Sequence, residues 1–182
     1  MSKLFILIFL ICLSPVFALV ALAIIIDDGF PIFFKQKRVG LHNTRFWIYK
    51  FRTMKKDSPD IATHLVNDSH FLYTKIGPFL RKFSIDELPQ LINIVKGDMT
   101  FIGPRPALYN QDDLIDMRTK AGVNRLVPGV TGWAQVNGRD ELSISDKVKM
   151  DEYYLKNKSL WLDIKILFKT VIKAFKSEGV SH

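Results

Sequence analysis

The sequence has little of what redox, zinc or nucleoside triphosphate chemistry requires. Its 182 residues include one cysteine, Cys12, which excludes an internal disulfide. The four histidines are scattered, and no Cys/His cluster has the spacing of a zinc site. The sequence has neither a P-loop nor an internal repeat. Its length allows one domain with a real core, and its distinctive features are positive charge, one long apolar run and two adjacent carboxylates.

The apolar run covers residues 4–26 and is long enough to cross a bilayer core of about 30 Å. It predicts a membrane segment, residues 1–28. A cleaved signal peptide is the alternative, but no small-residue cleavage site follows before Asp27. Ser14 and Pro15 interrupt the run, and a proline inside a helix removes a backbone hydrogen bond and kinks it. The kinked helix either spans the membrane or turns back as a re-entrant helix, and the residues leave both open.

A formal net charge of +8 predicts an anionic partner, which is a membrane surface, a nucleic acid or a phosphorylated substrate. Residues 32–40 and 45–52 are rich in aromatic and β-branched side chains around turn residues, and they predict a short β-hairpin. Basic and aromatic side chains interleave there, as at a lipid headgroup layer or on a nucleic acid. The adjacent membrane segment favours the headgroup layer.

Residues 159–176 have the pattern of an amphipathic helix, with an apolar face opposite Lys165, Lys169, Lys173 and Lys176. Beside a membrane anchor, this pattern favours a basic helix that lies in the membrane interface. A helix that packs its apolar face on the core and keeps its lysines in water would have the same pattern, so that alternative stays open.

The adjacent carboxylates are Asp86 and Glu87, and apolar residues follow them at helical spacing. Pro89 is tolerated only in the first turn of a helix, which places Asp86 near the N-cap. There the free N–H groups and the helix dipole would keep both carboxylates ionised and would favour bound anions. The alternative is a capping box of Ser84 and Glu87, in which the acids only begin a helix.

Several arginines occupy positions suited to phosphate. Arg81 comes just before the carboxylates and is a candidate phosphate ligand, or else a solvated charge. Arg105 stands between Pro104 and Pro106, which fix the backbone around it, although an ordinary proline-rich connector would look the same. Residues 128–140 gather turn formers around a tryptophan and Arg139, which predicts a binding wall rather than a helix.

Two carboxylates beside lipid could serve phosphoryl transfer between a nucleotide sugar and a polyprenyl phosphate. Both substrates are anions, so a divalent metal and several Lys or Arg side chains would have to complete such a site. One carboxylate could act as the nucleophile and split the transfer into two steps through a covalent acyl phosphate. The other could hold the metal or help to deprotonate the acceptor.

Six motifs together are highly specific: Ser14-Pro15, Lys50-Phe51-Arg52-Thr53-Met54, Arg81 followed by residues 84–91, Gly97-Asp98-Met99, Gly103-Pro104-Arg105-Pro106, and residues 128–139. With these motifs the chain resembles, almost end to end, the bacterial sugar transferases called monotopic phosphoglycosyl transferases.

The resemblance implies an α/β, mostly helical fold. A re-entrant membrane helix, residues 1–28, would be broken at Ser14 and Pro15, and residues 29–182 would form a small catalytic domain with a short β-hairpin and interfacial amphipathic helices. The domain would face the cytoplasm at the bacterial inner membrane and use Mg²⁺. It would transfer a sugar 1-phosphate from a UDP-sugar to undecaprenyl phosphate and release UMP, as the first membrane step of capsule, O-antigen or other glycoconjugate synthesis. No nucleic acid takes part, and a homodimer is left open.

Carried over position by position, the resemblance makes Asp86 the nucleophile and Glu87 its catalytic partner, with both as metal ligands. The candidate contacts to substrate or phosphate are Lys50, Arg52, Arg81, Arg105 and Arg139. Residues 105–111 and the ending 177–182 are most similar to members that act on N-acetylated 6-deoxyhexosamines. They indicate UDP-N-acetylfucosamine or a close relative as the donor.

Two other functions compete with this one. A non-catalytic, membrane-tethered basic module would bind nucleic acid or anionic lipid in a salt-sensitive way, and its binding would depend on neither Asp86 nor magnesium. An ordinary glycosyltransferase would move the sugar without its phosphate, and would release UDP instead of UMP.

Overall fold

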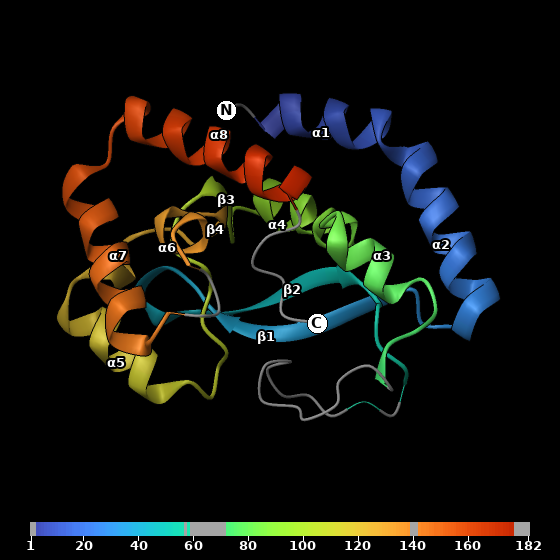
Figure 1. Cartoon of the computed structure of the whole chain (residues 1–182), viewed down its shortest axis with the longest axis horizontal. Helices are drawn as coiled ribbons and strands as arrows, with labels where there is room; N and C mark the ends of the chain where they lie inside the picture. Colours follow the sequence, from blue (N-terminus) through green and yellow to red (C-terminus); the bar gives the residue numbers. More distant parts are fainter. Residues whose placement is uncertain (1–2, 57, 59–71, 139–141, 177–182) are drawn as a thin grey trace.

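The computed structural model describes residues 3–56, 58, 72–138 and 142–176. Arg139 and the ending 177–182 lie outside the described residues. The order of the helices and strands is α1 (Lys3–Cys12), α2 (Ser14–Asp28), β1 (Phe33–Val39), β2 (Arg45–Phe51), α3 (Gly77–Lys82), α4 (Gln90–Lys96), β3 (Thr100–Ile102), α5 (Asp112–Lys120), β4 (Gly129–Thr131), α6 (Trp133–Val136), α7 (Ile144–Asn157) and α8 (Leu160–Lys176). The described fold is therefore mostly helical with small sheets, which agrees with the α/β class that the sequence predicts (Figure 1).

The N-terminal apolar run forms two helices with a bend of 54° between them. α1 ends at Cys12 and α2 begins at Ser14, with Pro15 in its first turn, where a missing N–H breaks no helical bond. Within the described residues, no helix taken alone has the length and apolar character of a membrane span. The bent pair Ile6–Cys12 and Ser14–Asp28 has both when taken together. The bend lies at the Ser14–Pro15 position that the sequence marks.

The N-terminal helices pack on the rest of the chain. Ile6 of α1 is buried with Ile48 of β2 and Ile94 of α4. Ile24 of α2 is fully buried in a second cluster with Phe51. The predicted membrane segment and the predicted catalytic domain therefore share hydrophobic cores, so α1 and α2 are fixed relative to the strand and helix that carry the site.

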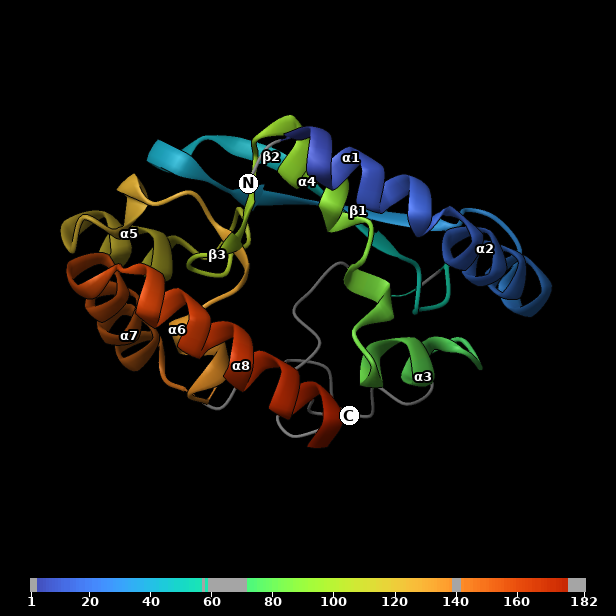
Figure 2. The ribbon, with the colours of Figure 1, turned by 90° about the horizontal axis from the view of Figure 1, so that it is seen from above.

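Large apolar side chains remain exposed on α1, α2 and α8. Leu19 of α2 is 69% exposed, and Leu160 and Phe168 of α8 are 78% and 67% exposed. α1 and α8 lie along the same side of the molecule in Figure 1, and Figure 2, seen from that side, shows them as two separate helices. Exposed apolar surface of this extent is unfavourable in water and indicates contact with a partner or a membrane.

α8 packs on the core through a different face from the one that its apolar pattern marks. Its inward residues include Leu162 and Ile166, which cluster with Tyr154 of α7. Lys165 and Lys169 flank this inner face and lie over the ring of Trp133, at 5.5 and 4.9 Å from its centroid. The alternative in which the apolar face of this helix packs on the core and its lysines stay in water is therefore wrong.

The predicted β-hairpin is present. β1 and β2 pair antiparallel, with Gln36 opposite Ile48. The fully buried amide of Asn93 on α4 joins this hairpin, because it donates to Trp47 O at 2.7 Å and accepts from the Tyr49 amide at 3.1 Å. A buried amide that satisfies two backbone groups of one strand fixes α4 in register with β2. This anchor sets where the chain just before α4 must lie.

A second small sheet supports the proline-rich turn. β3 and β4 pair in parallel, with Thr100 opposite Gly129. The backbones of Gly103 and Gly129 approach so closely that a Cβ on Gly129 would lie 2.1 Å from the amide nitrogen of Gly103. Only glycine fits at such an approach, and the chain after β3 is held tightly as it enters Pro104.

Candidate active site

Asp86 and Glu87 lie on a short 3-10 turn, Ile85–Glu87, between α3 and α4. α4 begins only at Gln90, and Pro89 is its N-cap. The prediction that Asp86 lies near the N-cap of this helix is therefore wrong by one turn. The capping box is also wrong, since Ser84 has left-handed backbone angles (φ 54°) and its hydroxyl caps no N–H among the described residues.

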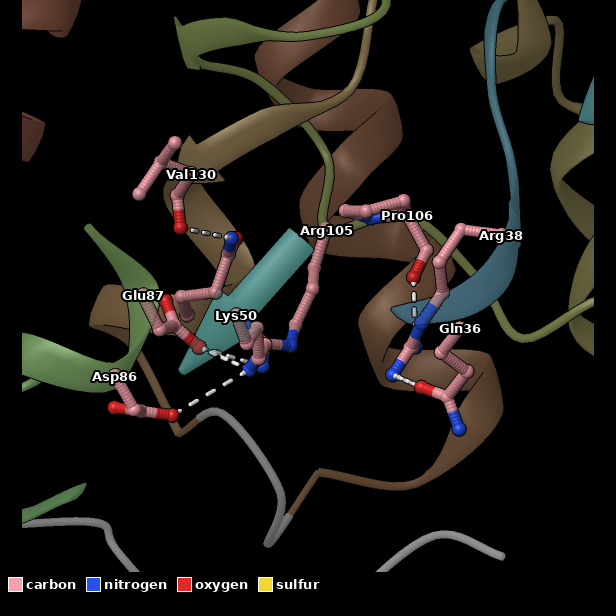
Figure 3. A network of polar contacts seen from close by, with 9 residues as sticks. Gln36, Arg38, Lys50, Asp86, Glu87, Arg105, Pro106 and Val130 are labelled. Atoms are coloured by element: carbon pink, nitrogen blue, oxygen red, sulfur yellow. Dashed lines mark hydrogen bonds and ion pairs between the residues drawn. The ribbon is translucent and has the colours of Figure 1, made fainter. Parts of the chain in front are cut away.

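The side chains of the carboxylate pair meet two cations from distant parts of the sequence (Figure 3). Lys50 of β2 places its Nζ 2.7 Å from Glu87 Oε1 and 3.9 Å from Asp86 Oδ2. Arg105 Nη2 lies 3.1 Å from the same Glu87 oxygen. Glu87 is thus held directly by two cations, whereas the ion pair of Asp86 within the described part of the chain is the longer one with Lys50.

Burial changes the protonation of this cluster. Loss of solvent raises the pKa of Asp86, the charge of Glu87 adds to the effect, and Lys50, Arg81 and Arg105 oppose it. Burial also lowers the pKa of Lys50, despite the two neighbouring carboxylates. Asp86 does not occupy the N-cap of α4, because it lies on the 3-10 turn before that helix, so the expected action of the helix dipole at the N-cap does not apply to it. Its ionisation is governed by burial and by the cations around it.

Arg81 of α3 is close enough for its charge to lower the pKa of Asp86. Its guanidinium carbon also lies 5.0 Å from the ring centroid of Tyr73. A cation stacked on an aromatic ring and near a buried carboxyl is held in place on two sides. The structure therefore brings Lys50, Arg81 and Arg105 together around the carboxylate pair.

Arg52 lies elsewhere, although it is two residues from Lys50. It forms an ion pair with Asp28 at the end of α2, and its guanidinium also donates to the carbonyl oxygens of Asp28, Gly29 and Pro31. Arg52 is buried, and these bonds use four of its five N–H donors. We therefore remove Arg52 from the candidate phosphate ligands, because its donors hold the turn after α2. The prediction for Arg139 falls outside the described residues.

Three residues that matter for the geometry of the site were not singled out by the sequence. Asn93 fixes α4 on the hairpin, and its signal is a polar residue inside an otherwise apolar helical run. Arg38 donates to the carbonyl oxygen of Pro106, and Arg118 donates to that of Arg105. No local pattern marks these two arginines, since each comes from a distant element.

The carboxylate pair has the donor chemistry of a magnesium site. Among the described side chains, no cluster of three or more His, Cys, Asp or Glu residues is placed to bind a metal. Mg²⁺ commonly takes one or two protein carboxylates and completes its shell with water and substrate phosphates. Asp86 and Glu87 fit that kind of site, with the phosphates of a substrate as further ligands.

Comparison with known proteins agrees with the family resemblance that the motifs indicate. The model of the family described as bacterial sugar transferase matches residues 1–177. The chain is 46% identical over 178 residues to the uncharacterized sugar transferase EpsL of Bacillus subtilis (strain 168), a match that covers 96% of this chain and 86% of EpsL.

Two further relatives carry the names of reactions. The UDP-N-acetylgalactosamine-undecaprenyl-phosphate N-acetylgalactosaminephosphotransferase of Aeromonas hydrophila is 40% identical, over 87% of this chain and 38% of that protein. The UDP-glucose:undecaprenyl-phosphate glucose-1-phosphate transferase of Escherichia coli (strain K12) is 37% identical, over 93% and 38%. The chain therefore spans most of EpsL but less than two fifths of each named phosphotransferase. From the family match and the identity to EpsL, the chain belongs to the bacterial sugar transferase family, and it is an enzyme of that family.

Proposed function

We propose that this enzyme transfers a sugar 1-phosphate from a UDP-sugar to undecaprenyl phosphate and releases UMP. The observation that carries the proposal is the pair of buried Asp86 and partly buried Glu87, surrounded by Lys50, Arg81 and Arg105. The relatives whose names state this kind of reaction supply the two substrate classes. A diphosphate donor and a phosphate acceptor are both anions, and this cluster of cations is what they require.

The geometry favours Asp86 as the nucleophile. Glu87 is held at 2.7 and 3.1 Å by two cations, whereas the nearest cation to Asp86 in this cluster stands at 3.9 Å. A carboxylate oxygen of Asp86 attacks the phosphorus that carries the sugar, and the bond from that phosphorus to the bridging oxygen breaks. UMP leaves with that oxygen, and the sugar phosphate remains on Asp86 as an acyl phosphate.

In the second step, an oxygen of undecaprenyl phosphate attacks the same phosphorus. The bond between this phosphorus and the Asp86 oxygen breaks, which restores the carboxylate and leaves the sugar on a lipid diphosphate. Attack in the first step requires ionised Asp86. Because burial raises its pKa, we expect UMP release to decline as the pH falls through that raised pKa.

The remaining side chains of the cluster stabilise charge. Lys50 and Arg105 stand where negative charge gathers on the transferred phosphoryl group, and Arg81 adds a third cation near Asp86. Asp86 and Glu87 would hold Mg²⁺ together with the donor phosphates, and the ion would supply further charge neutralisation there. Lys50 also keeps the two carboxylates from repelling each other before the substrate arrives.

We further propose that α1 and α2 form a re-entrant helix pair at the cytoplasmic face of the inner membrane. The 54° bend at Ser14 supports this arrangement, as do the exposed apolar side chains of α1, α2 and α8. A polyprenyl phosphate carries its headgroup at the membrane surface. An enzyme seated at that surface would meet the headgroup with its carboxylate pair.

The transferred sugar is proposed to be an N-acetylated hexosamine. The first candidate for the donor is UDP-N-acetylfucosamine or a close relative. Relatives at 40% and 37% identity are named for N-acetylgalactosamine and glucose, so overall identity does not select the sugar. A panel of UDP-sugars, assayed for UMP release with undecaprenyl phosphate and Mg²⁺, selects it. A clear preference for UDP-glucose would contradict this assignment.

The experiment that tests the reaction is the identification of the nucleotide product. We expect UMP from the wild-type chain, loss of at least about a thousandfold in Asp86→Asn, and dependence on added Mg²⁺. Release of UDP would identify an ordinary glycosyltransferase. A basic binding module would show salt-sensitive binding of lipid or nucleic acid that Asp86→Asn leaves unchanged, with no nucleotide product.

A further inference from the structure

The turn that carries Arg105 is held through every one of its carbonyl groups. The carbonyl oxygens of residues 104–107 each accept a hydrogen bond from another element. The donors are, in order, the amide of Gly129 at 2.9 Å, Arg118 Nη1 at 2.8 Å, Arg38 Nη1 at 3.1 Å and the amide of Val39 at 3.0 Å.

This pattern follows from the composition of the turn. Pro104 and Pro106 have no N–H to donate, so neighbouring elements can bind the turn mainly through its carbonyl oxygens. Backbone amides of β1 and β4 reach the two outer carbonyls. The two central ones, on Arg105 and Pro106, are bound by side chains. Guanidinium groups suit this task because their N–H donors form a rigid fork.

Arg118 is itself fixed by a buried carboxylate. On α5, its Nε and Nη2 lie 2.9 and 2.5 Å from Asp151 Oδ2 on α7. Asp151 is 1% exposed. With one edge of the fork bound to Asp151, the remaining Nη1 is directed at Arg105 O. Gln36 has the same relation to Arg38, because its Oε1 accepts from Arg38 Nη2 at 2.5 Å (Figure 3).

We infer that Arg118 and Asp151 are positioning residues for Arg105. Arg118 binds the backbone carbonyl of Arg105, and the Arg105 side chain reaches Glu87 at 3.1 Å. The buried pair between α5 and α7 thereby sets where the Arg105 guanidinium stands in the active site, without touching substrate itself. This inference rests on the proposed function only in taking Arg105 as a phosphate contact.

A double-mutant cycle on activity tests the inference. Arg118→Lys keeps a positive charge beside Asp151, but a single ammonium lacks the fork that binds Asp151 and Arg105 O together. We expect kcat/KM for UMP release to fall by about tenfold in the otherwise wild-type chain, and by less than about twofold in Arg105→Ala. Positioning acts through Arg105, so the effect should vanish when its side chain is absent.

Tyr154→Phe is the matched control. Tyr154 lies on α7 three residues after Asp151, is buried, and donates to Asp163 at 2.7 Å. The substitution removes a partly buried hydrogen bond made by the same helix, and none of the hydrogen bonds described for residues 104–107 involves Tyr154. Its effect on activity should multiply with that of Arg105→Ala. If the fold-change caused by Arg118→Lys also multiplies with that of Arg105→Ala, as in this control, Arg118 supports only the fold, and the inference is overturned.

Two further measurements keep the outcome decisive. Affinity for UDP, measured by calorimetry on the full chain, repeats the cycle without turnover, so it stands even if the proposed reaction fails. If Arg118→Lys does not fold, the double variant Arg118→Gln with Asp151→Asn replaces the buried charges by a neutral pair. If this double variant lowers activity in the wild-type background but not in Arg105→Ala, positioning is supported. An equal fold-change in both backgrounds contradicts it.

Discussion

Lys50 and Arg52 are two residues apart and show how an ion pair of the proposed active site differs from a structural one. Arg52 is buried and the Lys50 side chain is 16% exposed, and each meets a carboxylate from a distant part of the chain. Arg52 uses four of its donors on Asp28 and on backbone carbonyls, and so completes a turn. Lys50 stands between two carboxylates, one at 2.7 Å and one at 3.9 Å.

The difference lies in how fully the charges are satisfied. Around Arg52 the donors and acceptors match, which is the usual condition of a buried polar group. Around Lys50, burial lowers the pKa of Lys50 and raises the pKa of Asp86, so it favours the neutral form of both groups. Groups whose charge is costly until a ligand arrives are typical of catalytic sites. Saturation of the hydrogen bonds, more than burial or charge, separates the two pairs.

The largest expected difference between the two pairs is in activity. Replacement of Lys50 by methionine should lower kcat/KM for UMP release by about a hundredfold, because a preorganised cation is lost where charge develops. Arg52→Met should change the activity per folded molecule by less than about threefold. Steady-state kinetics on protein of verified fold compare the two variants. Equal losses would remove the distinction between a reactive and a structural pair.

How much of this contrast the sequence could predict is clear from individual residues. The hairpin and the Ser14–Pro15 break are local patterns, and the structure has both at the predicted position. The Asp86–Glu87 pair is also a local pattern, but it lies on a 3-10 turn before α4 and not at the N-cap of that helix. Arg52 was grouped with Lys50 because the two share one motif. Its partner Asp28 lies 24 residues earlier, and only the packing of α2 on the hairpin brings them together.

Two other misses have a local and a long-range cause, respectively. The expected helix N-cap at Asp86 failed because a left-handed residue, Ser84, inserts a separate 3-10 turn before α4. Propensity gives no sign of that turn, since serine has no special preference for these backbone angles. Arg118 and Asp151 could not be recognised, because their roles depend on where α5 and α7 place them around the turn at Arg105.

A second prediction reverses the contrast by measuring stability. Arg52→Met leaves several backbone carbonyls without donors and Asp28 without its cation. It should lower the free energy of unfolding by about 3 kcal/mol. The loss of a fully buried pair would cost more, because the Asp28 side chain is 30% exposed to solvent. Lys50→Met should cost less, because Glu87 keeps Arg105. Thermal unfolding in detergent or nanodiscs compares them, and a larger loss for Lys50→Met would contradict this assignment of roles.

The smallest expected effect, and the most specific, concerns the melting temperature. Asp86→Asn should raise it at neutral pH, whereas Asp28→Asn should lower it. The pKa of Asp86 is raised above its ordinary value of 3.8 in the folded chain. Its contribution to stability is therefore fully present below about pH 3.8 and is lost as the pH rises through the raised pKa. Asp86→Asn removes a buried charge at neutral pH, and it should raise the melting temperature there while giving no gain in acid.

Asp28→Asn is the matched comparison. It weakens the ion pair with Arg52, so it should lower the melting temperature at neutral pH. Melting curves of both variants between pH 4 and pH 8, against the wild-type chain, give the two signs directly. A drop in melting temperature for Asp86→Asn at neutral pH would mean that the cations around Asp86 outweigh its burial. The active-site carboxyl would then be as well satisfied as the structural one, and hydrogen-bond saturation could not explain which of them is reactive.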